Sequence, residues 1–199
     1  MTSITQDGTD SLSVWADLSI AGNNLTATDN TKKQPIWTSG GILFNGTTNF
    51  LTTTDYVQAQ PVSIYIVIKQ VTWTINDRFI NGRGGGDRCM IYSADATPGI
   101  AVNGGTSNST ISNNLAVNTW GVIRVIFDGA SSKFTVDDHD AITGSWGTNA
   151  PTGFTLGANQ LGTAQWSNIQ VKELIYRSAA DSDAVSDTIY TYLVNKYGL

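Results

Sequence analysis

The carboxylate side chains are the first place to look for chemistry in this sequence. Glycosidases place two carboxylates a few Å apart across the bond that they cut, but only one of the 16 acidic residues is a glutamate, Glu173. The aspartates lie mostly in turn-like or helix-starting positions, where their oxygens accept hydrogen bonds from backbone amides. We therefore expect a binding protein that is not an enzyme. A polysaccharide lyase or glycoside hydrolase is the alternative.

A short acidic segment is the one candidate for metal binding. Positions 137–140 read Asp-Asp-His-Asp and contain the only histidine, His139. Asp137, Asp138 and Asp140 could offer oxygen ligands to Ca²⁺. Successive residues of a strand face opposite ways, so these carboxylates converge only if the chain turns there. Ca²⁺ is the one cofactor to consider, and a turn capped by its own carboxylates is the competing interpretation.

Aromatic side chains supply a second kind of chemistry, because their ring faces can stack on sugar rings. The chain has six Trp and seven Tyr in an otherwise polar composition. Trp73, Trp146 and Trp166 lie beside turn residues, and we select Trp73 and Trp146 as candidate ligand-binding residues. Trp15 and Trp120 lie in strand-like segments and are expected in the core. Packing in the core is the competing interpretation for each tryptophan.

The segment 75–88, INDRFINGRGGGDR, is the most unusual stretch of the chain. Three consecutive glycines lose much backbone entropy when they become ordered, so such a loop is either mobile or bent to let a ligand approach. The charged residues around it are candidate ligand-binding residues: Asp77, Arg78, Arg83, Asp87 and Arg88. A phosphate-binding loop is a weaker interpretation, because no helix start and no P-loop lysine follow. A flexible hairpin without a ligand is the competing interpretation.

The composition argues against several kinds of partner. The net charge is −5, and the eleven basic residues form no cluster that could bind nucleic-acid phosphates. No run approaches the roughly 18 apolar residues of a membrane span, so we expect no membrane insertion. The single cysteine, Cys89, cannot form an intrachain disulfide, and its strand-like surroundings predict a small buried side chain.

The N-terminal residues carry neither the basic start nor the apolar run of a secretory signal. We expect a chain that is either released without a signal, as a virion component would be, or cut from a longer protein. The expected location is extracellular or in a virion.

The elements that must position these residues are mostly strands. In 63–71, Ile64, Ile66 and Ile68 alternate with Tyr65 and Val67, so both faces of this strand should be buried. The segments 120–129, 132–138 and 169–177 show similar alternation, and the Asp-Gly at 128–129 predicts a hairpin turn between the first two. Shorter candidates lie at 42–44, 49–53, 78–81, 88–92, 99–102, 140–143 and 153–157.

A helix is expected at the end of the chain, from 181 to 197. Val185, Ile189 and Leu193 recur at helical spacing, acidic residues lie near its start, and Gly198 follows as a stop. Many short strands separated by turn residues predict two packed antiparallel sheets. The expected fold class is therefore all-β, a two-sheet antiparallel sandwich with a C-terminal α-helix, and residues 1–199 are expected to form a single domain.

Two ends of the chain resemble a known family. The opening residues SVWADLS (13–19), GNNLTA (22–27), QPIW (34–37) and ILFNGTTNFLTT (42–53) resemble the start of laminin G-type jelly rolls of the concanavalin A-like superfamily, as found in bacterial and phage proteins. The strand 169–177 and the helix that follows resemble the end of the same domains. The resemblance implies a jelly-roll sandwich in which Trp15, Asp17, Phe44 and Gly46 are framework residues.

The resemblance does not settle the function, because this architecture carries lectins, glucanases and protein-interaction modules alike. Together with the many Trp and Tyr residues and the missing pair of catalytic carboxylates, the resemblance favours a carbohydrate-binding, lectin-like domain whose partner is a glycan or polysaccharide. A phage fibre or tail protein or a carbohydrate-active protein is the expected setting. The alternative is a structural or protein-interaction domain of a virion, with other virion or host-surface proteins as partners and a homo-oligomer as its state.

Overall fold

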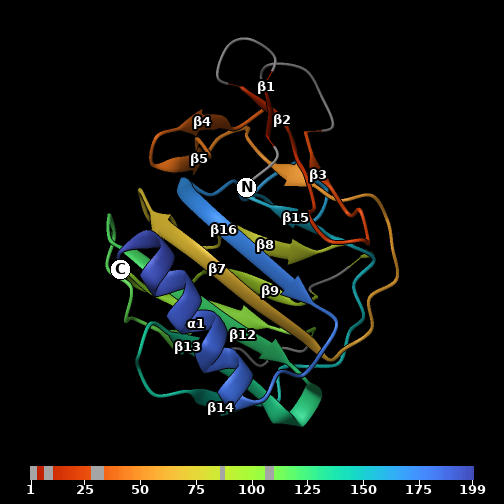
Figure 1. Cartoon of the computed structure of the whole chain (residues 1–199), viewed down its shortest axis with the longest axis vertical. Coiled ribbons are helices and arrows are strands. Elements are labelled where there is room, and N and C mark those ends of the chain that lie inside the picture. The colour runs from red at the N-terminus through yellow and green to blue at the C-terminus, as the bar shows by residue number, and fades with distance from the viewer. Residues whose placement is uncertain (1–3, 7–10, 28–33, 86–87, 106–109) are drawn as a thin grey trace.

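The computed structural model describes residues 4–6, 11–27, 34–85, 88–105 and 110–199 of the chain. Neighbouring strands pair antiparallel throughout these residues and form two sheets. One α-helix, α1 (Asp183–Tyr197), follows the last strand (Figure 1). The predicted all-β sandwich with a C-terminal helix is confirmed.

The first sheet has nine strands, most of them short. In spatial order they are β1 (Ile4–Gln6), β2 (Leu12–Trp15), β3 (Leu25–Thr26), β6 (Leu51–Thr52), β15 (Phe154–Leu156), β8 (Arg78–Gly82), β9 (Met90–Ser93), β10 (Ile100–Asn103) and β11 (Thr110–Ser112).

The second sheet has seven strands and contains the three longest ones. In spatial order they are β14 (Ile142–Gly144), β13 (Ser132–Val136), β12 (Trp120–Phe127), β7 (Val62–Gln70), β16 (Ile169–Arg177), β5 (Gly41–Leu43) and β4 (Ile36–Thr38). The predicted hairpin joins β12 to β13 through a 3₁₀ turn, η1 (Gly129–Ser131).

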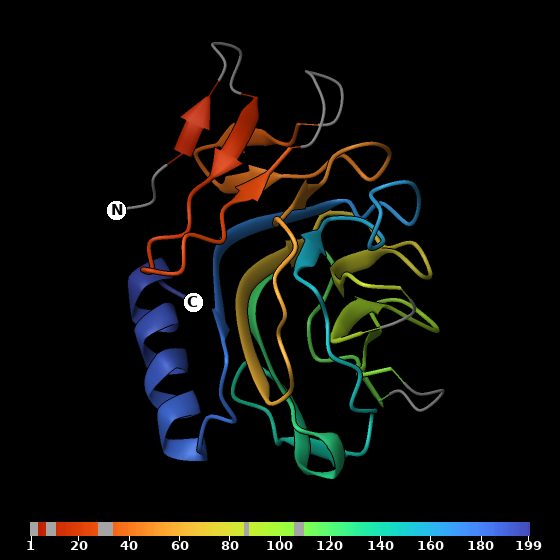
Figure 2. The same cartoon turned by 90° about the vertical axis from the view of Figure 1, so that its right-hand side faces the viewer.

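The molecule is layered as helix, seven-stranded sheet and nine-stranded sheet (Figure 2). β7 shows why both faces of its sheet are buried. Ile64, Ile66 and Ile68 point into the core between the sheets, whereas Tyr65 and Val67 pack beneath α1 in a second apolar cluster with Leu193. The two faces match the alternation expected from the sequence.

The framework residues implied by the resemblance lie where a framework would need them. Trp15 is 8 % exposed and Phe44 is fully buried. Gly46 has φ +70°, and a Cβ there would lie 2.9 Å from the Cβ of Asn168, so both backbone angle and space favour glycine. Cys89 is buried, as expected, and this burial raises the pKa of its thiol to about 12.

The helix ends as its residues predict. Ser182 caps its start, because the side chain accepts a hydrogen bond from the Val185 amide. Gly198 ends it in the left-handed conformation with φ +65°. Within the described residues, no helix has both the length and the apolar character that crossing a membrane requires.

The two edges of β16 differ in how far they pair with neighbouring strands. β16 pairs with β7 along its whole length, with a bulge at Lys172, but it pairs with β5 only at Gln170 and Val171. From Glu173 to Arg177, no described strand pairs with the other edge of β16. Backbone groups along this edge therefore remain available to a ligand.

Candidate functional site

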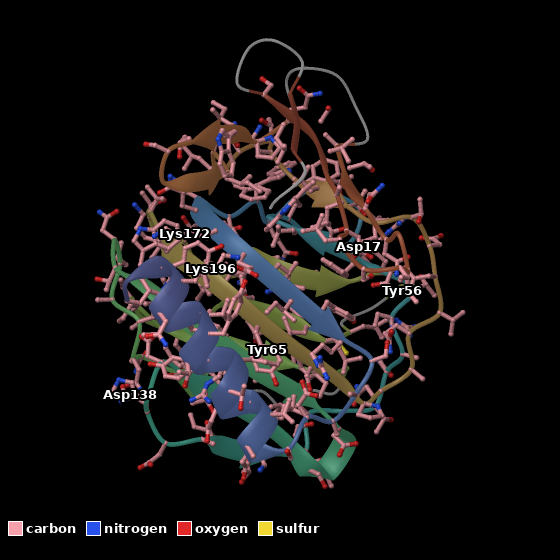
Figure 3. All side chains as sticks on the ribbon, in the orientation of Figure 1. Asp17, Tyr56, Tyr65, Asp138, Lys172 and Lys196 are labelled. Atoms are coloured by element: carbon pink, nitrogen blue, oxygen red, sulfur yellow. The ribbon has the colours of Figure 1, made fainter. Side chains whose placement is uncertain are left out.

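A hollow of about 540 Å³ lies along this free edge of β16. Four parts of the chain line it: residues 15–25, the segment around Tyr56 and Gln58, residues 172–178, and Tyr192 and Lys196 on the last turns of α1. Figure 3 shows Asp17 and Tyr56 together on one side of β16, and Lys172 and Lys196 together near the start of β16 and the end of α1. We call it the β16 pocket.

Asp17 organises the loop on one side of the pocket. Its carboxylate accepts hydrogen bonds from the backbone amides of Ser19 and Asn23, both at 2.8 Å, and from the Ser19 hydroxyl at 2.9 Å. Burial raises the pKa of Asp17, but these hydrogen bonds outweigh it and hold the pKa below its usual value. Asp17 is therefore ionised, and the loop 17–24 is held in one shape.

Aromatic rings form the wall beside this loop. Tyr176 stacks on Phe154 with ring centroids 4.8 Å apart and ring planes 6° from parallel, and Tyr56 and the largely buried Trp15 line the same wall. Burial, reinforced by the charge of Asp17, raises the pKa of Tyr56 to about 12, so its phenol stays protonated. The Tyr176 hydroxyl is buried and has no hydrogen-bond partner among the described residues.

The opposite wall is built on Glu173. Its oxygens accept hydrogen bonds from Lys196 Nζ (2.7 Å), the Tyr197 hydroxyl (2.7 Å) and the Tyr192 hydroxyl (3.2 Å). Burial lowers the pKa of Lys196, but its hydrogen bonds with Glu173 and Tyr192 outweigh that effect and raise the pKa above its usual value. This network ties the end of α1 to β16 and leaves the Tyr192 ring about half exposed.

The arrangement suits non-covalent binding of a polar ligand with apolar faces. Ligand pockets of roughly 300–1,000 Å³ usually combine aromatic walls with a few fixed polar groups. The β16 pocket offers both, because aromatic residues line it together with Asp17, Lys196 and the free strand edge.

The sequence-selected ligand residues lie elsewhere: none of those that the structure describes lines the β16 pocket. Arg83 donates to the Thr53 carbonyl and forms an ion pair with Asp55 at 2.7 Å. Arg88 donates to the carbonyls of Gly85 and Ala150. Both guanidinium groups therefore hold the protein's own loops in place. Asp87 lies outside the described residues.

The remaining selected residues are also engaged in packing. Arg78 is buried, with its guanidinium carbon 4.5 Å from the centre of the Tyr92 ring, and the adjacent Asp77 is half-buried. The indole of Trp73 donates to the Gly99 carbonyl at 3.2 Å. Their proposed contact with a ligand stays a prediction.

Trp146 needs a correction. It was expected beside a turn with a usable ring face, but it is only 2 % exposed and packs edge-on against Phe127 at 6.4 Å between ring centroids. The ring therefore belongs to the core and presents no face to a sugar. Neighbouring turn residues did not indicate exposure, because Gly144 lies directly against the ring, where a Cβ would come within 2.4 Å of the indole nitrogen.

The proposed Ca²⁺ site also needs a correction. Asp137 turns inward, where its carboxylate accepts a hydrogen bond from the Val122 amide at 2.7 Å and where burial raises its pKa. Asp138 and Asp140 are exposed and line a separate hollow of about 380 Å³ at the start of α1. Across the residues described, no three His, Cys, Asp or Glu side chains gather closely enough to hold a metal ion. Asp137 instead caps a backbone amide, as the competing interpretation expected.

The residues of the β16 pocket were not selected from the sequence, although some signs of them were present. Tyr192 and Lys196 are four residues apart on a helix, so they share a face, and Glu173 is the only glutamate of the chain. The sequence could not show that this face meets β16 beside the loop of Asp17. That meeting depends on the early end of β5, which frees the strand edge.

Comparisons with known proteins find similarity in structure only. No family model matches the sequence, and no curated protein matches it. Among solved structures, the chain is similar to Trypanosoma rangeli sialidase in complex with sialic acid, with a TM-score of 0.68 and 14 % identity over 95 % of this chain and 32 % of that one. A mutant of the same sialidase that displays trans-sialidase activity gives 0.67 and 13 %, covering 98 % and 32 %.

A second kind of similar structure is the binding domain of botulinum neurotoxin serotype G. Here the TM-score is 0.64 at 10 % identity, over 89 % of this chain and 48 % of that one. These likenesses show a shared β-sandwich fold. The chain spans about a third of the length of the sialidases and about half of the toxin domain, so it corresponds to a part of each.

Proposed function

We propose that this chain is a non-catalytic glycan-binding domain whose ligand lies in the β16 pocket. The observation that carries the proposal is the pocket itself, a hollow of about 540 Å³ that Tyr56, Tyr176 and Tyr192 line. Sugar rings bind to proteins by stacking on such faces, while their hydroxyls exchange hydrogen bonds with fixed polar groups. Asp17, Lys196 and the free edge of β16 supply those groups.

The comparisons support this proposal without identifying a ligand. One similar structure is a sialidase with sialic acid bound, and another is the binding domain of a toxin. Fold alone does not carry function, so the argument depends on the side chains of this chain. Within the β-sandwich class, we infer a jelly roll of the concanavalin A-like, laminin G type from the Trp15–Asp17 and Phe44–Gly46 segments.

The way in which the two pocket carboxylates are held supports a non-catalytic role. A glycosidase needs a carboxylic acid whose pKa is raised, so that it can protonate the leaving group. The pKa of Asp17 is lowered instead. The oxygens of Glu173 are occupied by Lys196, Tyr192 and Tyr197. Neither side chain is arranged as a general acid.

A glycan array tests the proposal, with Tyr192→Ala as the pocket variant. Tyr192 is 47 % exposed, so its removal should cost little stability. It should weaken binding of the recognised glycan about tenfold, a loss of about 1.4 kcal/mol. Tyr190→Ala is the matched control, because Tyr190 lies on the same helix but outside the pocket, over Arg124. Silence across a broad array of folded protein, or equal losses in both variants, would contradict the proposal.

The free edge of β16 favours one second candidate, an extended peptide that adds a strand to the sheet. Leu18 and Val57, which are 66 % and 85 % exposed, could contact the side chains of such a peptide. A peptide would be recognised through backbone hydrogen bonds along this edge, and the glycan array would then show no binding. Selection from a random peptide library beside the glycan array separates the two candidates, since a selected peptide together with a silent array favours the peptide.

A further inference from the structure

The two sides of the β16 pocket carry opposite charge. Asp17 is an ionised carboxylate on the side of Tyr56, while Lys172 and Lys196 lie on the side of α1 (Figure 3). Lys69 lies close by, because it and Lys172 approach the same ring of Trp120. Three of the chain's six lysines therefore gather at one end of a pocket in a protein whose net charge is −5. Glu173 is the carboxylate among them.

Lys172 is the lysine of this group that is free to bind an anion. It sits at the bulge of β16, and its Nζ lies 4.3 Å from the centre of the Trp120 ring and 5.4 Å from that of Tyr197. The electron-rich ring faces hold the ammonium in place without neutralising it. Lys172 forms no ion pair with any residue that the structure describes.

Lys196 differs, because its ammonium already has a carboxylate partner. Its Nζ lies 2.7 Å from a Glu173 oxygen and 2.7 Å from the Tyr192 hydroxyl. This pair cancels one positive charge and one negative charge. The excess at this end of the pocket is therefore the positive charge of Lys172, together with that of Lys69 at the same Trp120 ring. Cations held ready in this way favour an anionic ligand group over a neutral one.

We infer that the glycan is acidic and that its carboxylate or sulfate group pairs with Lys172 at the α1 end of the pocket. This inference rests on the proposed function. The sugar ring that carries the acidic group then lies beside Tyr192, and the rest of the glycan extends along β16 toward Tyr56. The ionised Asp17 at the far end disfavours the reverse orientation.

The test is an array of matched pairs, in which each carboxylated or sulfated glycan is printed beside its neutral counterpart. The expected result is at least a tenfold preference for the acidic member, and the two kinds of acid show which group is recognised. Lys172→Gln should remove about tenfold of the affinity for the acidic member and affect the neutral member clearly less. Lys133→Gln is the control, since Lys133 pairs with Asp183 at the other end of α1.

Two further readouts keep the inference testable if Lys172→Gln disturbs the fold. Lys172→Arg retains the positive charge and should retain the preference, and a rise in salt should weaken the acidic member more than the neutral one. Equal binding of both members, with no effect of salt, would overturn this inference and leave the proposed function intact. Absence of binding to any glycan by the folded protein would instead overturn the proposed function.

Discussion

The β16 pocket and the β8–β9 hairpin use polar and aromatic side chains in opposite ways. In the hairpin and the adjoining segment 146–152, the guanidinium groups of Arg83 and Arg88 donate to backbone carbonyls, and Trp146 is buried. In the pocket, Tyr192 keeps a half-exposed ring, and Lys172 has no ion-pair partner among the described residues. Charged residues that cluster in the sequence can thus serve to hold loops in place, while the candidate site forms where separate segments of the chain meet.

The largest expected effect lies in the hairpin region. Trp146→Ala removes a ring that is 2 % exposed and packs on Phe127, so the free energy of unfolding should fall by about 3–5 kcal/mol. Urea denaturation measures this loss. Trp73→Ala, at a partly exposed ring, should cost clearly less. If Trp146→Ala instead kept full stability and lost glycan binding, the hairpin region would be the place where the glycan binds, in contradiction to the β16 pocket.

A smaller effect is expected at Asp77, near the start of β8. Burial raises its pKa from 3.8 to about 6. Because the folded state then favours the protonated form, Asp77 stabilises the fold fully below about pH 3.8. This contribution is lost as the pH rises toward 6.

Asp77→Asn should therefore raise the melting temperature at pH 7.5 and have little effect at pH 4. Thermal unfolding at the two pH values measures this difference. Asp138→Asn, at an exposed carboxylate, is the control. A stabilisation that was the same at both pH values would show that the titration of Asp77 is not its cause. Glycan binding should not change, since Asp77 lies outside the pocket.

Much of the fold could be predicted from the sequence. The alternation in 63–71 places Ile64, Ile66 and Ile68 in the core, and the segment 169–177 is a strand over the predicted range. The short strands β1, β3, β4 and β11 were not predicted. Each has two or three residues, too few for a period of two to stand out, and each pairs with strands of at most four residues.

The candidate site was less predictable than the fold, for a physical reason. Trp146 and the arginines at 83 and 88 were selected because turn residues and glycines surround them, but such loops often pack on the protein itself. The pocket brings together Asp17, Tyr56, Lys172 and Tyr192, which are separated by up to most of the chain. Only the pairing of β16 with β5 and β7 decides which strand edge stays free.

The most direct test of the central claim is to map the bound glycan onto the chain. Backbone amide chemical shifts of isotope-labelled protein should be followed during titration with the glycan that the array selects. The account predicts that the largest changes fall in residues 16–24, 56–58, 172–178 and 192–197, with little change in the hairpin. Changes concentrated in residues 82–90 and 146–152, with the β16 pocket unaffected, would contradict it.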